Sequence, residues 1–204
     1  IIWKIRLPRV LMAGILGGAL ALSGFLLQTF FSNPIAGPYV LGISSGAKMM
    51  VALAMIIFLK YYTLVSSYIL IIAAFIGSML SIGFILLLAR KIRNMATLLV
   101  GGIMIGSICS AVTDFVVTFA EDSDIVNLHG WSQGSFSGMS WSNVKVAALM
   151  VGITLILTFF LSKPIGAYQL GEMYAQSMGV NIRVFRVLLI LLSSVFSACV
   201  TAFA

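Results

Sequence analysis

Long apolar runs separated by short polar segments make up most of the chain. Each run is apolar on all sides and approaches the roughly 20 residues that a helix needs to cross the hydrocarbon core of a bilayer. Membrane-spanning strands would instead alternate apolar and polar positions over about 10 residues. The pattern therefore predicts an all-α, polytopic transmembrane helix bundle with about six spanning helices. The predicted spans are Val10–Phe31, Gly42–Leu59, Tyr68–Ala89, Leu98–Phe119, Val144–Leu161 and Val184–Ala204.

The connections between these runs carry most of the polar residues. The first, TFFSNPIAGPYVLG, contains an Asn-Pro and a Gly-Pro pair, which break helices and favour turns. The third, ARKIRN, is short and basic. The fourth, AEDSDIVNLHGWSQGSFSGMSWSN, is long, acidic and rich in glycine, serine and tryptophan. The fifth is basic overall and contains the polar segment LGEMYAQSMGVN.

The segment LGEMYAQSMGVN predicts a short helix rather than a plain loop. Gly171 can end the preceding segment, and Glu172 and Ala175 keep helical spacing. Gly179 ends the helix, because glycine favours the left-handed position that follows a helix C-terminus. Asn181 is a candidate cap for the next helix. A helix of about two turns is not stable alone, so it needs a partner protein or a place on the bundle's own surface.

Composition supports a membrane protein and argues against an enzyme. The chain is 61% hydrophobic and 8% charged, whereas soluble domains are about 45–50% apolar and about 25% charged. Cys109 and Cys199 lie inside apolar runs, and the single His129 cannot form a metal cluster, so we predict no metal site. No Walker A, GxGxxG, HExxH or GxSxG motif is present. Any energy source must therefore belong to another chain.

The net charge of +7 comes from basic residues that cluster between apolar runs rather than along a nucleic-acid-binding stripe. Six of them fall near span ends on one predicted side; they are Arg90, Lys91, Arg93, Lys163, Arg183 and Arg186. Lys60 and Lys145 fall on the other side, together with the N-terminal group Lys4, Arg6 and Arg9. With the N-terminal group set aside, the positive-inside rule places LGEMYAQSMGVN and the Asn33–Pro34 connection in the cytoplasm. Arg6 and Arg9 are then outside.

Two ionisable residues inside the predicted spans have alternative interpretations. Asp114 lies about five residues, or about 8 Å, from the outer end of its span. It can reach the interface or a partner there, or contact a cationic or hydroxylic substrate. Lys48, near the predicted cytoplasmic start of its span, can extend its ammonium to the interface. The aromatic residues predicted to anchor span ends are Trp131, Trp141, Tyr61 and Tyr62.

Small residues four apart predict close helix packing in two spans. Gly14 and Gly18 form one GxxxG pattern, and Gly102, Gly106 and Ser110 form another. In lipid, such positions let two helix backbones approach closely. We interpret both patterns as contacts within the bundle.

Five stretches together resemble one protein family. In order, they are RLPRVLMAGILGGALALSG, NPIAGPYVLGISSGA, LLVGGIMIGSICSAV, WSQGSFSGMSW and SKPIGAYQLGEMYAQSMGVNIRVFR. They resemble the FecCD-type permeases of type II ABC importers, which take up iron-siderophores, haem or vitamin B12. The resemblance covers essentially all 204 residues. Because family members have about ten helices, we expect this chain to correspond to helices two to seven and to be incomplete at both ends.

The resemblance implies a single transmembrane permease domain that is not itself an enzyme. Its expected partners are ABC ATPase subunits carrying ATP-Mg, an extracytoplasmic substrate-binding protein, and a second permease as homodimer or paired subunit. The expected location is the cytoplasmic membrane of a prokaryote, as a multi-pass protein without a cofactor of its own. The alternative is a secondary transporter or another polytopic protein without ATP coupling. A secondary transporter would need paired ionisable groups or broken helices near the midplane.

The resemblance also implies roles for individual residues. A cytoplasmic coupling region spans 167–181, and its expected ATPase-coupling residues are Gly171, Glu172, Ala175, Met178 and Gly179. Arg6 and Arg9 are expected to bind acidic residues of the binding protein through two exposed guanidiniums. The expected cytoplasmic gate consists of Asn33, Ile35, Met95 and Ala96. The family often has hydroxyl residues at the last two positions. Asp114 is the candidate substrate-path residue.

Overall fold

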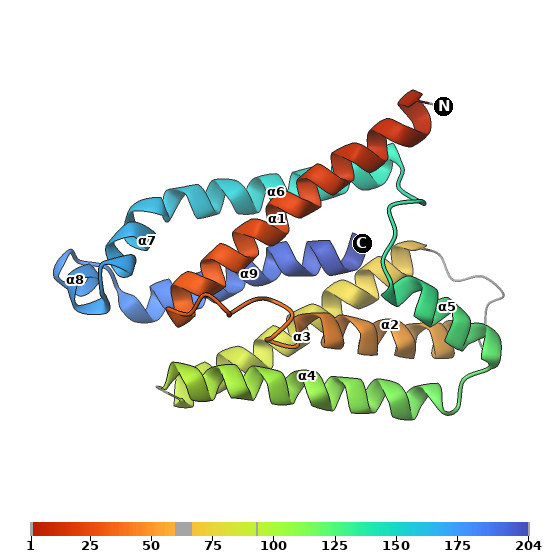
Figure 1. Cartoon of the computed structure of the whole chain (residues 1–204), viewed down its shortest axis with the longest axis horizontal. Helices are drawn as coiled ribbons and strands as arrows, with labels where there is room; N and C mark the ends of the chain where they lie inside the picture. The colour runs from red at the N-terminus through yellow and green to blue at the C-terminus, as the bar shows by residue number, and fades with distance from the viewer. Residues whose placement is uncertain (1, 60–66, 93, 204) are drawn as a thin grey trace.

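The computed structural model describes residues 2–59, 67–92 and 94–203, and every regular element in that part is a helix (Figure 1). The elements are a π-helical turn at Ile2–Arg6, α1 (Leu7–Phe31), α2 (Ile43–Leu59), α3 (Ser67–Lys91), α4 (Met95–Val117), α5 (Asp122–Ser132), α6 (Trp141–Phe160), α7 (Ser162–Gln169), α8 (Glu172–Ser177) and α9 (Ile182–Phe203). The predicted all-α, polytopic bundle is confirmed. Five described helices are long and apolar enough to span a bilayer, and α2 is a shorter apolar helix.

The connections alternate between the two ends of the bundle. Figure 1 shows α7, α8, the end of α1 and the start of α4 at one end, which we call the α8 end. The N-terminus, α5 and the start of α6 lie at the other, the α5 end. This is the alternation that the sequence predicts for consecutive spans. Arg93, Lys60, Tyr61 and Tyr62 lie outside the described residues.

The short length of α2 follows from the non-helical segment 32–42. Pro34 and Pro38 lack a backbone N–H donor, so this segment cannot continue as a helix. Its polar groups bond locally instead: Asn33 Oδ1 accepts from the Ile35 amide at 2.9 Å, and Gln28 Nε2 donates to the Pro34 carbonyl at 3.1 Å. The segment runs along the bundle from the α8 end, and α2 begins only part-way across (Figure 1).

Small residues allow α2 to pack closely against both neighbouring helices. A Cβ atom added at Gly106 would lie 3.1 Å from the Cα atom of Gly42, and one added at Gly102 would lie 3.1 Å from the Cα atom of Leu41. The predicted packing role of Gly102 and Gly106 is confirmed, whereas Ser110 is exposed. On the opposite side, Gly46 of α2 meets Gly77 of α3 backbone to backbone.

The predicted packing of Gly14 and Gly18 within the bundle is wrong for this chain. Both residues are exposed, and nothing lies within 4 Å of a Cβ atom added at either one. The reason is that α1 uses another face for its internal contacts. That face carries Met12, Leu16 and Ala19, which are at most 2% exposed.

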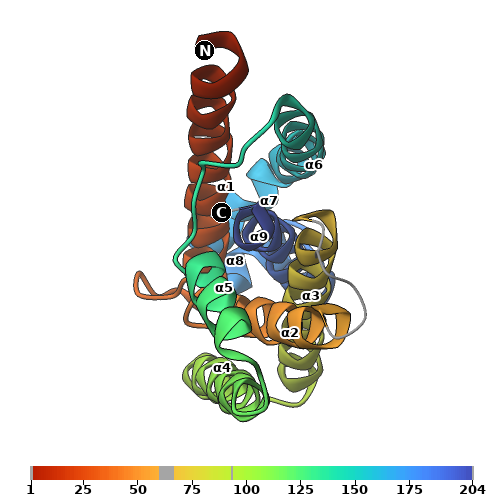
Figure 2. The same cartoon turned by 90° about the vertical axis from the view of Figure 1, so that its right-hand side faces the viewer.

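The helix α9 lies at the centre of the bundle (Figure 2) and is the most buried of the five candidate spans in the described residues. Two buried serines join it to α1. Ser23 Oγ donates to the Ser193 carbonyl at 2.8 Å, and Ser193 Oγ donates to the Ser23 carbonyl at 3.1 Å. Such interhelical hydrogen bonds hold helices together where lipid offers no polar partner.

The long acidic connection contains a helix that the sequence pattern did not predict. The helix α5 has 11 residues and carries Asp122 in its first turn and His129 in its last. A carboxylate at a helix N-terminus stabilises it through the helix dipole. The hydrophobic pattern missed α5 because the segment is too polar to show a continuous apolar face.

We predict that Gly77→Ala destabilises the folded protein by about 1–3 kcal/mol, the usual cost of overpacking. The added methyl group would overlap the Gly46 carbonyl oxygen, which belongs to a backbone that cannot shift easily. Thermal unfolding of the purified protein in detergent measures the effect. Gly83→Ala on the same helix is the matched control, because nothing lies within 4 Å of its added Cβ atom. Equal melting temperatures for the two variants would contradict this packing.

Candidate functional site

The α8 segment has a glycine with positive φ at each end. Gly171, with φ 127°, separates α8 from α7, and Gly179, with φ 87°, follows its last turn. The Gly179 amide donates to the Gln176 carbonyl and the Val180 amide to the Ala175 carbonyl, both at 3.0 Å. This pair of hydrogen bonds is a Schellman motif. The predicted short helix, ended by Gly179, is confirmed.

The predicted cap at the start of α9 is also confirmed. Asn181 Oδ1 accepts a hydrogen bond from the Val184 amide at 3.3 Å. Four residues, 178–181, therefore connect α8 to α9. This short connection leaves α8 close to the start of the central helix.

The α8 segment carries several large, exposed apolar side chains among its polar ones. Met173 is 81% exposed, Met178 62% and Tyr174 48%, and Leu170 just before the helix is 73% exposed. Clustered exposed apolar side chains at one end of a molecule are typical of an interaction site.

Among the expected coupling residues, Gly171, Glu172, Met178 and Gly179 are exposed, but Ala175 is fully buried. Ala175 thus packs α8 against its own chain, and its side chain is not available to a partner. Glu172 forms an ion pair within the chain, with Arg186 Nη2 2.7 Å from Glu172 Oε2.

The four expected gate residues all lie in segments at the α8 end, where α1 ends and α4 begins (Figure 1). Ile35 is 77% exposed, and Asn33 holds its turn through the Ile35 amide. Met95 and Ala96 form the first turn of α4, which Asn94 caps by accepting from the Ala96 amide at 2.9 Å. The gate role itself stays a prediction.

The two expected docking arginines differ in their surroundings. Arg6 is exposed, but Arg9 is half-buried and donates through Nη2 to the Ser137 carbonyl at 2.5 Å. The expectation of two exposed guanidiniums is therefore wrong for Arg9. The reason is that the 134–140 connection folds back over the start of α1.

A second contact fixes the same connection. Trp141 Nε1 donates to the Trp3 carbonyl at 3.0 Å, and the two indole rings lie 5.4 Å apart. Trp141 thus has a structural partner in addition to its predicted position at a span end.

The helix α4 presents a polar strip on one side and an apolar one on another. Ser107, Ser110 and Asp114 are exposed and line an open groove shared with Tyr39 and Ser45 of the α2 region. No ion pair involves Asp114 within the described part of the chain. The exposed apolar strip is made of Met104, Ile108, Val112 and Phe115. The polar groups of α4 therefore face the groove, and the apolar strip lies on another side of the helix.

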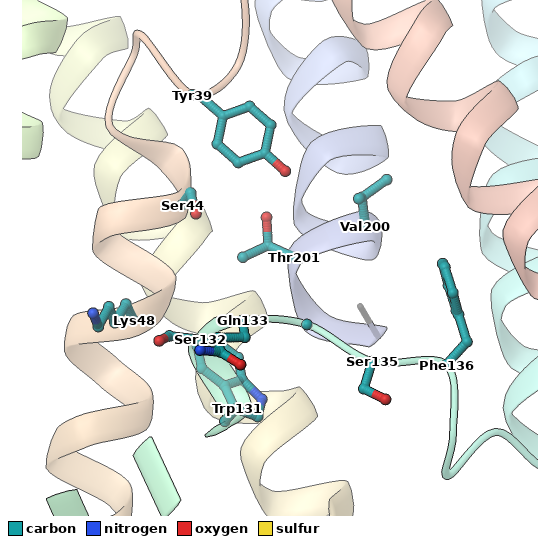
Figure 3. A pocket seen from close by; sticks show the side chains of 11 residues that line it. Tyr39, Ser44, Lys48, Trp131, Ser132, Gln133, Ser135, Phe136, Val200 and Thr201 are labelled. Carbon is teal, nitrogen blue, oxygen red and sulfur yellow. The ribbon is translucent and has the colours of Figure 1, made fainter. Parts of the chain in front are cut away.

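A second cavity of about 340 Å³, lined by both polar and apolar side chains, lies between α2, α5 and α9 (Figure 3). Lys48 and Trp131 both line it. Lys48 lies near the start of α2, as predicted, and its side chain lines the cavity next to α5. Its reach to the cytoplasmic interface stays a prediction. Trp131 faces the cavity from α5 instead of marking the end of a span (Figure 3).

Comparison with known proteins identifies the family. The model of the FecCD transport family matches residues 1–204. The chain belongs to the FecCD transport family. This confirms the resemblance, and the family match extends over the α8 segment, both arginines and α4.

Among FecCD relatives, the hemin transport system permease protein HmuU of Yersinia pestis is 37% identical over 203 residues, covering 98% of this chain and 61% of the relative. The vitamin B12 import system permease protein BtuC of Klebsiella pneumoniae is 34% identical, covering 93% of this chain and 56% of the relative. A solved structure described as an inward-facing metal-chelate type ABC transporter matches with TM-score 0.88 and 27% identity, covering 98% of this chain and 63% of that one. The chain thus spans about three-fifths of the relatives' length.

We predict that Gly179→Ala loosens the α8–α9 turn by about 1–2 kcal/mol, the cost of a left-handed conformation for a residue with a Cβ atom. Hydrogen exchange of the Val180 amide should become about tenfold faster. Gly166→Ala, in α7, is the control, since nothing lies within 4 Å of its added Cβ atom and its φ is not positive. Unchanged exchange at Val180 would rule out the Schellman motif.

Proposed function

We propose that the protein is a membrane-spanning permease subunit of an ABC importer, which moves a metal chelate into the cytoplasm. The cargo class is an iron-siderophore, haem or cobalamin. The observation that supports this most directly is the group of exposed apolar side chains on α8, at one end of a helix bundle whose sequence matches the FecCD transport family. The sequence carries no nucleotide-binding motif. The relatives' names refer to hemin and vitamin B12 transport.

In this proposal the α8 end faces the cytoplasm and contacts an ATPase that binds ATP-Mg. The α5 end faces outward, where Arg6 binds acidic residues of a substrate-binding protein. Arg9 supports this surface by holding the 134–140 connection. A second permease subunit completes the assembly in the cytoplasmic membrane of a prokaryote. The net basic character of the α8 end agrees with this orientation.

The proposed mechanism is alternating access. ATP closes the ATPase dimer, which displaces α8, and the two permease subunits rearrange around a central path. The polar groove of α4, with Ser107, Ser110 and Asp114, faces this path. Asn33, Ile35, Met95 and Ala96 close its cytoplasmic end. Hydroxyl and carboxylate groups along a path give a large polar cargo transient hydrogen-bond partners without holding it tightly.

The non-helical segment 32–42 also resembles the broken helices at which secondary transporters bind their substrates. Two observations favour ATP coupling instead. The family match covers the whole sequence, and α8 offers a partner a docking surface that a self-contained transporter does not need. Of the described residues, no pair of ionisable side chains meets at the start of α2.

We predict that cysteines at Ser107 and Ser110 react with a charged, membrane-impermeant thiol reagent, because the thiolate forms only where water reaches it. The measurement uses the full-length permease in membranes, with Cys109 and Cys199 replaced by alanine. Ile108→Cys, on the apolar strip, is the matched control and should stay unlabelled. Labelling of Ile108→Cys at the same rate would mean that the groove does not face the path.

We predict that Met173→Glu weakens binding of the ATPase by about tenfold or more, because a charge in the centre of an interface costs about 2 kcal/mol. Co-purification of the full-length permease with its ATPase, followed by uptake in proteoliposomes, measures the effect. The control is Val126→Glu, which is 69% exposed on α5 at the opposite end. Intact assembly and uptake with Met173→Glu would exclude α8 as the docking site.

A further inference from the structure

Arg186 connects three consecutive helices at the α8 end. It lies near the start of α9, and its Nη2 donates to Glu172 Oε2 of α8 at 2.7 Å. Its Nε donates to the Tyr168 hydroxyl of α7 at 3.5 Å. Within the described part of the chain, Glu172–Arg186 is the one salt bridge.

The α7 partner of Arg186 is held firmly by the core. Tyr168 is 7% exposed, and its ring lies 5.3 Å from that of Phe185, which is 3% exposed. Glu172, by contrast, has a side chain that is 46% exposed. The guanidinium therefore ties a carboxylate at the surface of α8 to a buried aromatic pair.

The helix α8 has few other attachments. It has six residues, and a helix of that length does not persist without tertiary contacts. Gly171 at its N-terminus provides no side-chain cap, and Ala175 is its one buried residue. Both flanking glycines allow the chain to bend sharply. The orientation of α8 thus depends on the packing of Ala175 and on the Glu172–Arg186 ion pair.

This ion pair assigns Glu172 a different role from the one that the family resemblance implies. One of its carboxylate oxygens accepts from Arg186 of the same chain and is directed toward α9. The surface left for docking includes the exposed apolar side chains Leu170, Met173 and Met178, beside the exposed polar Gln176 and Ser177. Glu172 then acts within its own chain, where its ion pair with Arg186 holds α8 in place.

We propose that Arg186 is a positioning residue that makes α7, α8 and the start of α9 one rigid unit. When the ATPase displaces α8, this unit transfers the displacement to α9. From the centre of the bundle, α9 passes it to α1 through the Ser23–Ser193 hydrogen bonds. The inference rests on the proposed function, since it concerns how ATP hydrolysis is coupled to movement of the bundle.

The test uses charge reversal in the full-length permease assembled with its ATPase and binding protein in proteoliposomes. The variants are Arg186→Glu, Glu172→Arg and the exchanged double variant Glu172→Arg/Arg186→Glu. The readout is cargo taken up per ATP hydrolysed, together with co-purification of the ATPase. Arg183→Glu is the matched control, because Arg183 is exposed three residues earlier and has no partner among the described residues.

Each single reversal should leave the ATPase bound but lower uptake per ATP by about fivefold or more, the range of a typical coupling energy. The double variant should recover most of this loss, because the pair is restored with its signs exchanged. The double variant tests the pair itself, whereas intact ATPase co-purification together with lowered uptake per ATP separates lost coupling from a defect in folding or assembly. Arg183→Glu should behave like the wild type.

The inference is overturned if the single reversals keep the wild-type ratio, or if the double variant is no better than the single ones. Should a reversed variant fail to assemble, Arg186→Gln and Tyr168→Phe test the same contacts without a repulsive charge. Retained coupling in both would also overturn the inference. The proposed function fails separately, when the wild-type permease itself neither binds the ATPase nor takes up cargo.

Discussion

The structure depends on one constraint, which is that a bilayer offers no water to backbone polar groups. Long helices satisfy these groups internally, so within residues 2–59, 67–92 and 94–203 irregular backbone lies at the ends of the bundle and in one segment inside it. That segment, 32–42, meets the constraint through local turns and the side chains of Gln28 and Asn33. As a result α2 is short, its Lys48 lines the cavity beside α5, and Tyr39 of the segment lines the α4 groove.

In a bilayer, close packing between helix backbones, rather than the hydrophobic effect, holds the helices of the bundle together. Gly42 against Gly106 and Gly46 against Gly77 set α2 between α4 and α3. The paired serines set α9 against α1. Because these contacts use backbone and small side chains, they leave α4 with separate buried, apolar and polar faces. The polar face supplies the hydroxyl and carboxylate groups that line the groove of an otherwise apolar helix.

The two ends of the bundle are stabilised in a similar way but present different surfaces. At each end, an arginine near the start of a long helix binds the neighbouring connection: Arg9 binds Ser137, and Arg186 binds Glu172. At the α5 end this leaves Arg6 as an exposed cation. At the α8 end it leaves an apolar surface on a helix too short to stand alone. The proposed function assigns the first surface to an acidic binding protein and the second to an ATPase.

The sequence by itself determined the helical membrane fold, the alternation of the connections, the α8 helix and its glycine end, because these follow from local hydrophobicity and backbone preference. The family also followed from ordered motifs. The tertiary structure decided what local patterns cannot contain: that Gly14 and Gly18 face outward, that Lys48 lines a cavity, and that Ala175 is buried. It also decided the partners of Arg9 and Arg186. Those pairings depend on which faces of the helices meet. The sequence of a run that is apolar on every side does not indicate which face will contact a neighbour.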